Sequence, residues 1–273
     1  MGNIDESDNS SFGFLRAHDD LFQKQIITSG SKDYLTPVEG STCEFTLENL
    51  IDENNCAFPS SPLQVGFHNS FPSYLLSRAL QTMTLNEKSR FSAQYGREWI
   101  SFEVWLLSFE EKPEVYTWTK EHKLDMCHSL KKLGGDLFKK NDYLWSFHNY
   151  QRSLVFLSFT KDSDDEMMDL KAQLISNIAL CQSNLKPSCS EKPIANLTLV
   201  LQMEPNNVKA LFRRAKHFLS LNDFERAEED IEKAYALDPA NAKILEQKQL
   251  LKKKMQEHDG FTASAMAKFF GSK

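Results

Sequence analysis

The segment from Val208 to Asn241 restricts the fold of this chain more than any other part of the sequence. Its first half places apolar and small residues on one helical face, namely Leu211, Ala215 and Phe218. Its second half repeats the pattern with Phe224, Ala227, Ile231 and Ala234. Leu221-Asn222-Asp223 indicates a turn between the halves, and Asp238-Pro239 ends the second helix because proline lacks the N–H donor. The segment therefore predicts two closely packed helices joined by a tight turn.

Weaker copies of this helical pair precede it at an interval of roughly 34 residues. One interval before Pro239, Pro205 closes a copy that starts at Leu170 and contains Asn177-Ile178-Ala179-Leu180-Cys181. Its connector, Lys186 to Pro193, is longer than a tight turn, so the next helix is expected to start near Pro193. The remaining copy spans Leu130 to Phe159. A final amphipathic capping helix is expected over Lys243 to His258. Three repeats are about the minimum that buries a continuous core.

These three helical pairs resemble tetratricopeptide repeats, most clearly in Val208 to Asn241. The resemblance implies an all-α array whose first helices line a concave groove for a partner peptide. A generic helical bundle is the competing interpretation of the same periodicity.

In chaperone-binding members of the repeat family, cations and amides in the groove hold the C-terminal carboxylates of a peptide. The positions that match form the predicted peptide-carboxylate clamp, which consists of Lys131, Asn177, Lys209 and Arg213. Gly135 departs from the pattern, which has asparagine there. The resemblance implies a peptide ending in acidic residues, like that of the cytosolic ninety-kilodalton heat-shock chaperone. A solvated helix face is the competing interpretation for each lysine or arginine.

The front half of the chain has a different residue pattern, in which short β-like runs are separated by turns. The runs are Lys24 to Thr28, Thr42 to Leu47, Arg90 to Tyr95 and Trp99 to Phe109. One helical stretch, Ser73 to Gln81, lies between the second and third runs. This order predicts an α+β domain in which one helix packs on an antiparallel sheet. Apolar residues on both faces of the last run predict that it is a central strand.

The order and spacing of motifs in this half resemble the FK506-binding (FKBP) type of prolyl isomerase. These motifs are Lys24 to Ser31, Pro37-Val38-Glu39-Gly40, Phe58-Pro59-Ser60-Ser61, Leu80 to Glu87, Tyr95-Gly96 and Phe102 to Leu106. The predicted fold class is an α+β FKBP-like antiparallel sheet with one helix, followed by an all-α tetratricopeptide-repeat array. The expected domains are a disordered tail (1–12), the FKBP-like domain (13–112), three repeats with a capping helix (113–258) and a C-terminal tail (259–273).

Catalytic members of this family hold the substrate proline in an aromatic cup, and the match to that cup is partial. Leu76 stands at the tryptophan that forms the floor, Pro59 at an aspartate of the wall, and Leu47 at a tyrosine of the second strand. The residues of this degenerate isomerase pocket are Phe58, Leu76, Tyr95 and Phe102.

The loop that overhangs the family's pocket is also missing, because only Arg97 and Glu98 separate Tyr95-Gly96 from the last strand. Prolyl isomerisation needs a fitted apolar pocket to lower a barrier of roughly 18–20 kcal/mol. We therefore predict no catalytic residues. On this view the aromatic side chains are core residues of a retained scaffold.

Composition and cysteine usage narrow the function classes further. The 273 residues carry a formal net charge of −6, whereas a nucleic-acid binder needs a basic footprint, so no nucleic-acid partner is expected. With no secretory signal and no apolar run of roughly 18 residues, we expect no membrane partner and a cytoplasmic, and also nuclear, location. The five cysteines form no paired short-spacing motif, which fits reduced thiols. Cys127-His128 with His122 lacks a second cysteine pair, so neither a metal nor a cofactor is expected.

The sequence thus predicts a noncatalytic immunophilin-like adaptor, or co-chaperone, that holds protein partners in its repeat groove. The family likeness implies two such partners, a heat-shock chaperone C-terminal peptide and a casein-kinase-type clock kinase. Two alternatives stay open. The chain is an active peptidyl-prolyl isomerase acting on chaperone clients, or the groove carries the whole function and the front domain is a passive spacer.

Overall fold

A computed structural model describes residues 22–33, 35–52, 57–95, 98–158, 165–185 and 190–271. The predicted tail 1–12 lies outside these residues. The chain divides into two compact units, Met1–Thr160 and Lys161–Lys273. The predicted domain boundary near residue 112 falls within the first unit, because the first helical pair groups with the sheet.

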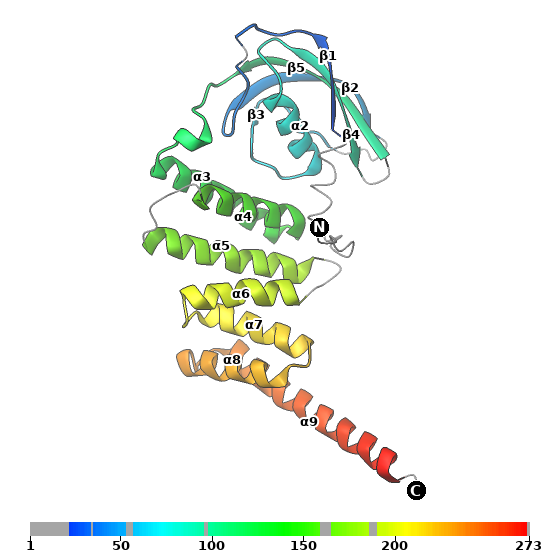
Figure 1. Ribbon diagram of the computed structural model, residues 1–273, viewed down its shortest axis with the longest axis vertical. Helices are drawn as coiled ribbons and strands as arrows, with labels where there is room; N and C mark the ends of the chain where they lie inside the picture. Colours follow the sequence, from blue (N-terminus) through cyan, green and yellow to red (C-terminus); the bar gives the residue numbers. More distant parts are fainter. Residues whose placement is uncertain are drawn as a thin grey trace, which may run out of the picture. The chain divides into compact units, whose positions relative to one another are not determined.

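The first unit contains a five-stranded antiparallel sheet in the order β1-β4-β5-β2-β3 (Figure 1). The strands are β1 (Gln23–Thr28), β2 (Thr42–Asp52), β3 (Leu63–Gln64), β4 (Lys88–Tyr95) and β5 (Glu98–Phe109). All four predicted strands are present, and β2 continues past its predicted end at Leu47. β3 was not predicted, because two residues are too short to show a period of two.

β5 is a central strand, as predicted, but only one of its faces is buried. On the outward face, Trp105 is 43% exposed to solvent and Leu107 is 38% exposed. The predicted reason, burial on both faces, was therefore wrong. The strand is central because it pairs with β4 on one side and β2 on the other.

Helix α2 (Phe71–Gln81) packs on the inner side of the sheet (Figure 1). Ser70 and Ser73 fix its start with a reciprocal capping box, in which each side chain accepts from the other's backbone N–H. One face of the helix is almost fully buried, through Leu75, Leu76, Ala79 and Leu80. It shares one hydrophobic cluster with the inward residues of β5, which are Ile100, Phe102, Val104 and Leu106.

The first helical pair, α3 (Lys120–Lys139) and α4 (Tyr143–Ser158), is joined to this domain through buried contacts. Leu137 and Trp145 belong to the same hydrophobic cluster as the sheet and α2. His68 Nδ1 lies 3.1 Å from His148 Nε2, and Asn149 Nδ2 donates to the His68 carbonyl oxygen at 2.6 Å. Sheet, α2 and first helical pair therefore form one packed body.

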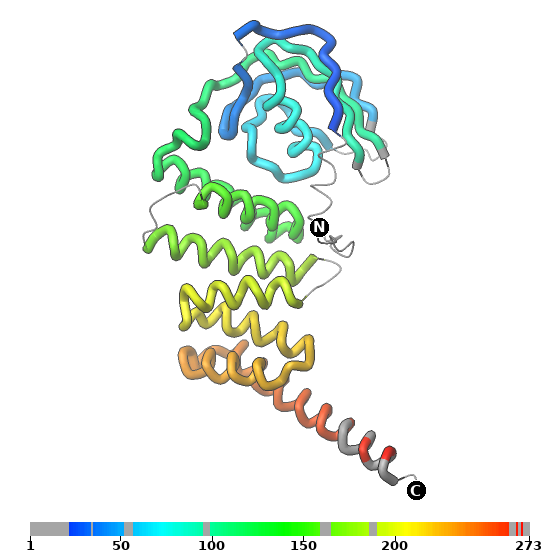
Figure 2. Tube along the Cα trace, viewed as in Figure 1, coloured from blue at the N-terminus to red at the C-terminus, as the bar shows by residue number. Residues whose placement is uncertain are grey.

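The second unit consists of paired helices (Figure 2). These are α5 (Asp165–Asn184), α6 (Glu191–Met203), α7 (Val208–Ser220), α8 (Phe224–Leu237) and α9 (Ala242–Gly271). The predicted turn between α7 and α8 is confirmed, since Asn222 takes a positive φ of 57° and Asp223 caps α8. α9 continues through the predicted tail as far as Gly271. The connector residues 186–189 lie outside the described part of the chain.

Two adjacent glycines in α3 provide a test of how closely α3 and α4 pack. A Cβ on Gly134 would lie 2.8 Å from the buried ring of Tyr150, whereas on Gly135 the nearest atom is the Tyr150 hydroxyl at 3.7 Å. Gly134→Ala should lower the free energy of unfolding by about 1–3 kcal/mol through overpacking. Gly135→Ala should raise it by about 0.5–1 kcal/mol, because alanine loses less backbone entropy in a helix. Chemical denaturation followed by circular dichroism measures both, and equal effects would contradict this packing.

The buried imidazole pair makes the stability of the first unit pH-dependent. Burial lowers the pKa of His148 to about 4, and burial together with the charge of His148 lowers that of His68 to about 3. Below the ordinary pKa of about 6.5, the unfolded chain therefore binds protons that the folded chain excludes. Unfolding free energy should fall as pH drops from about 6.5 towards 4, with a slope of up to about 2.7 kcal/mol per pH unit for two groups.

The matched variant for this prediction is His148→Gln, which removes one titrating group and keeps a hydrogen-bonding side chain. Denaturation at several pH values should show a shallower slope in the variant, whatever its absolute stability. An unchanged slope would mean that other groups govern the acid sensitivity.

Candidate functional site

The described side chains of the predicted isomerase-type pocket lie in or against the hydrophobic core of the first unit. Leu76 and Phe102 have no exposed surface, and Phe58 is half-buried with its ring 5.1 Å from that of Phe102. Leu47 is half-buried and packs on the same core. Tyr95 ends β4, but its side chain lies outside what the structure describes. The structure thus brings Phe58 and Phe102 together and buries Leu76 in the same core.

The connection beside this pocket is as short as the sequence indicates. Tyr95 pairs with Glu98, so β4 and β5 stay in register up to their ends. Only Gly96 and Arg97 separate the strands, and these two lie outside the described residues. No long loop is inserted at this point of the chain.

In the second unit, polar contacts connect the first helices of successive repeats. Arg213 Nη1 on α7 donates to the Ser176 hydroxyl on α5 at 2.6 Å and to the Ser176 carbonyl oxygen at 3.3 Å. Asn177, the next residue of α5, is half-buried, and Lys209 on α7 is exposed. Three of the four predicted clamp residues therefore belong to two helices that Arg213 and Ser176 connect.

The neighbouring arginine of α7 has a different role. Arg214 Nε and Nη2 donate to both carboxylate oxygens of Asp230 on α8, at 2.8 and 2.7 Å. Its Nη1 donates to the Thr198 hydroxyl of α6 at 3.1 Å. The Asp230 side chain is only 6% exposed, so this pair packs the helices together. Consecutive residues on a helix point about 100° apart, which separates the structural arginine from Arg213.

Sequence analysis missed two further residues on the clamp side of α7. Lys216 is exposed and lies seven positions after Lys209, which returns it to the same helical face. His217 lies one turn beyond Arg213, and its Nε2 is 2.8 Å from the Ser183 hydroxyl on α5. Burial, with the charge of Lys216, lowers the pKa of His217. The sequence signal for both was their spacing, because Lys216 and His217 lie seven and eight residues after Lys209 and so share its helical face.

The fourth predicted clamp residue, Lys131, is half-buried on α3 in the first unit. Gly135 lies one turn further along the same helix. A Cβ built there makes only an ordinary contact, so the position has room for a Cβ atom.

The described cysteine side chains are buried. Cys43, Cys127 and Cys181 are buried free thiols, while Cys56 and Cys189 lie outside the described residues. Burial raises the pKa of Cys43 to about 12 and that of Cys127 to about 11, which keeps both thiols protonated. Within the described ranges, no three His, Cys, Asp or Glu side chains are grouped to hold a metal ion. Every described helix falls short of the length and apolarity that crossing a membrane requires.

A sheet with one packed helix, followed by paired helices, is the architecture of an FKBP-like domain joined to a tetratricopeptide array. The predicted fold class is thus confirmed. No family model matches the chain.

Relatives of known sequence include proteins named for FK506 binding and for prolyl isomerisation. Human "Peptidyl-prolyl cis-trans isomerase FKBP4" is 29% identical over 241 residues, covering 80% of this chain and 51% of that protein. "FK506-binding protein 59" of Drosophila melanogaster is 29% identical over 194 residues, covering 66% and 44%. Residues 1–211 of CG17282, a solved structure, share the fold with a TM-score of 0.54 and 20% identity, over 61% of this chain and 91% of that one.

These comparisons confirm the likeness to FKBP-type immunophilins, and the chain is similar to FKBP4 over 80% of its length. It spans about half the length of the curated relatives it matches.

Proposed function

We propose that this chain is a noncatalytic adaptor that binds the acidic C-terminus of a partner protein on the groove side of its second unit. The observation that carries the proposal is the arrangement around α7. Lys209 and Arg213 lie one turn apart on one face, and Arg213 is held against the turn of α5 that carries Asn177.

This arrangement suits a peptide that ends in carboxylates. Lysine and arginine form charge-assisted hydrogen bonds to the α-carboxylate and to acidic side chains, and the Asn177 amide pairs with peptide backbone. The hydrogen bond that Arg213 donates to Ser176 orients the guanidinium before a ligand arrives, which lowers the ordering cost of binding. The cytosolic ninety-kilodalton heat-shock chaperone ends in such a sequence, and we propose it as a partner.

The proposed loss of isomerase activity rests on the pocket itself. A tryptophan floor and an aspartate wall are replaced by Leu76 and Pro59, and the register of β4 and β5 supports the absence of an overhanging loop. A catalytic pocket must bind the twisted amide better than the planar one, and these replacements remove the groups that shape it.

Active prolyl isomerisation is the second candidate function. It is favoured by the FKBP4 relatives, which carry that activity in their names. Phe58 and Phe102 also keep two aromatic positions of the family's cup.

We further propose a casein-kinase-type kinase as a client. This step comes from the chain's resemblance to the immunophilin-like protein Bride of Doubletime, and no described residue carries it. Gel filtration of the full chain with a purified kinase of that type tests it, and separate elution would overturn the kinase client alone.

The clamp predicts binding that depends on a free C-terminus. Calorimetric titration of the full chain with a peptide ending in Met-Glu-Glu-Val-Asp should give a saturable signal that is lost when the C-terminus is amidated. Lys209→Ala should weaken binding by roughly tenfold or more, because a hydrogen bond to a charged group contributes about 1.5–3 kcal/mol.

Lys233→Ala is the matched control, since Lys233 is an exposed lysine on α8, the second helix of the same repeat. It should leave the affinity within about twofold, the small effect usual for a surface substitution. Lys131→Ala tests the remaining sequence-predicted residue in the same titration. Binding that Lys209→Ala leaves untouched would move the site elsewhere, and no binding by a folded sample would overturn the clamp.

The degenerate pocket predicts no catalysis. In a protease-coupled assay with proline tetrapeptides, the rate with this chain should equal the uncatalysed rate, because the fitted floor and wall are gone. Human FKBP4 serves as the comparison protein. A rate well above background would establish the second candidate function instead.

A further inference from the structure

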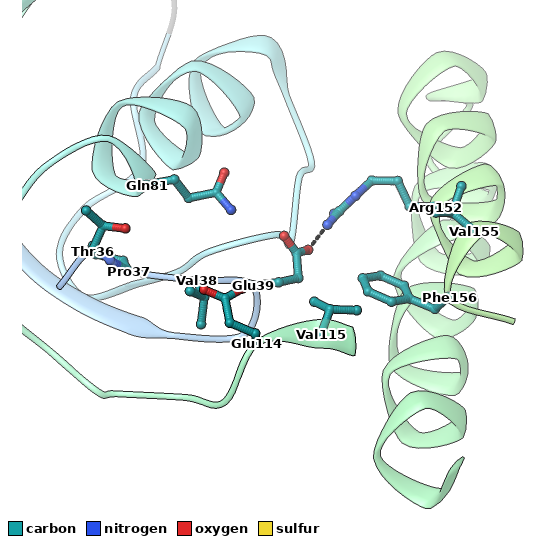
Figure 3. A pocket seen from close by; sticks show the side chains of 10 residues that line it. All are labelled: Thr36, Pro37, Val38, Glu39, Gln81, Glu114, Val115, Arg152, Val155 and Phe156. Atoms are coloured by element: carbon teal, nitrogen blue, oxygen red, sulfur yellow. Dashed lines mark ion pairs between the residues drawn. The ribbon is translucent and has the colours of Figure 1, made fainter. Parts of the chain in front are cut away.

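A cavity of about 450 Å³ opens in the first unit between the loop before β2 and helix α4 (Figure 3). It uses none of the residues of the isomerase-type pocket or of the clamp. Its apolar lining comes from Pro37, Val38, Val115, Val155 and Phe156. Its polar lining comes from Thr36, Glu39, Gln81, Glu114 and Arg152.

An ion pair crosses one wall of this cavity. Arg152 of α4 reaches towards Glu39 of the loop, and its Nη2 pairs with the Glu39 carboxylate (Figure 3). The two side chains are 17% and 15% exposed. Gly66 packs so closely against the pair that a Cβ there would collide with the carboxylate. The backbone around the pair therefore fixes the position of the guanidinium.

One nitrogen of this guanidinium has no acceptor among the described residues. Arg152 Nη1 is buried, and the described residues offer it no hydrogen-bond partner. Leaving a buried donor unpaired costs roughly 1–3 kcal/mol, so such a group in a cavity wall indicates a missing acceptor. Burial lowers the pKa of Arg152 to about 10, which still leaves it charged at neutral pH.

The charges around the cavity restrict what the acceptor is. Glu39 already neutralises Arg152, and Glu114 adds a second carboxylate, so the site as a whole is negative. An anionic ligand would be repelled by that excess charge. A neutral carbonyl satisfies Nη1 without this cost, and a neighbouring cation is attracted to Glu114.

We propose that this cavity is a second peptide-binding site, which takes an extended internal segment carrying an aliphatic residue followed by a basic one. A backbone carbonyl of the segment accepts from Arg152 Nη1, and the Gln81 amide pairs with the next peptide group. The aliphatic side chain lies against Val115, Val155 and Phe156, and the basic one faces Glu114. The site needs no free C-terminus, which separates it from the clamp.

The test uses a terminally blocked probe on the full chain. N-acetyl-Ala-Leu-Lys-Ala-amide is titrated while the methyl resonances of Val115 and Val155 are followed by NMR. Saturable shifts at those methyls are expected, and N-acetyl-Ala-Leu-Glu-Ala-amide should bind at least several-fold more weakly. Because both probes are amidated, failure of the clamp would not affect the result.

Two variants locate the contact. Arg152→Lys keeps a cation for Glu39 but lacks the second nitrogen, and it should weaken binding roughly tenfold, the loss expected for one hydrogen bond to a charged group. Val155→Trp, at a position that is 51% exposed, should fill the cavity without disturbing the core and abolish the shifts. Leu199→Trp on α6, at a position 43% exposed, is the matched control and should have no effect.

Three results would overturn the proposal. They are absence of saturable shifts with a folded sample, equal binding of the lysine and glutamate probes, and shifts that persist in Val155→Trp.

Discussion

The hydrophobic core that the sheet domain shares with its first helical pair is the constraint on which the front of this protein depends. Leu137 and Trp145 come from the helical pair, yet they lie in the cluster that α2 and β5 build. The buried contacts of His68 with His148 and Asn149 close the same joint with hydrogen bonds. Removing the front domain would expose the apolar surface of the first helical pair. The front domain is therefore part of the packing of that pair and not only a spacer. The cavity beside Arg152 exists because this joint brings the loop before β2 against α4.

The two adjacent arginines of α7 make different contacts. Arg214 is committed to the nearly buried Asp230, where removing either partner would leave a charge without compensation. Arg213, one residue away, is half-buried and bonded to an uncharged serine of the preceding repeat. The same helix thus contacts α5 through Arg213, and α6 and α8 through Arg214.

Much of the fold was predictable because its signals are local. Alternating apolar residues identified all four longer strands, and helical periodicity with Pro239 and Asn222 identified α7, α8 and the turn between them. The weak points were short or non-local features. β3 has only two residues, and the exposure of Trp105 depends on which side of the sheet α2 covers, a fact that the strand's own pattern does not contain. The clamp positions remain a prediction from family likeness, whereas the contacts of Ser176 and His217 depend on the packing of α5 against α7.

The sequence by itself determined the two-part architecture, the short connection after Tyr95 and the presence of leucine at position 76. These features follow from residue identity and spacing along the chain. Only the tertiary structure decided that the first helical pair shares a core with the sheet, and which of two neighbouring arginines is spent on an internal ion pair. It also revealed that Arg152 keeps a buried nitrogen to which no described residue offers an acceptor. These outcomes depend on contacts between residues far apart in the chain, and such contacts leave no periodic trace in the sequence.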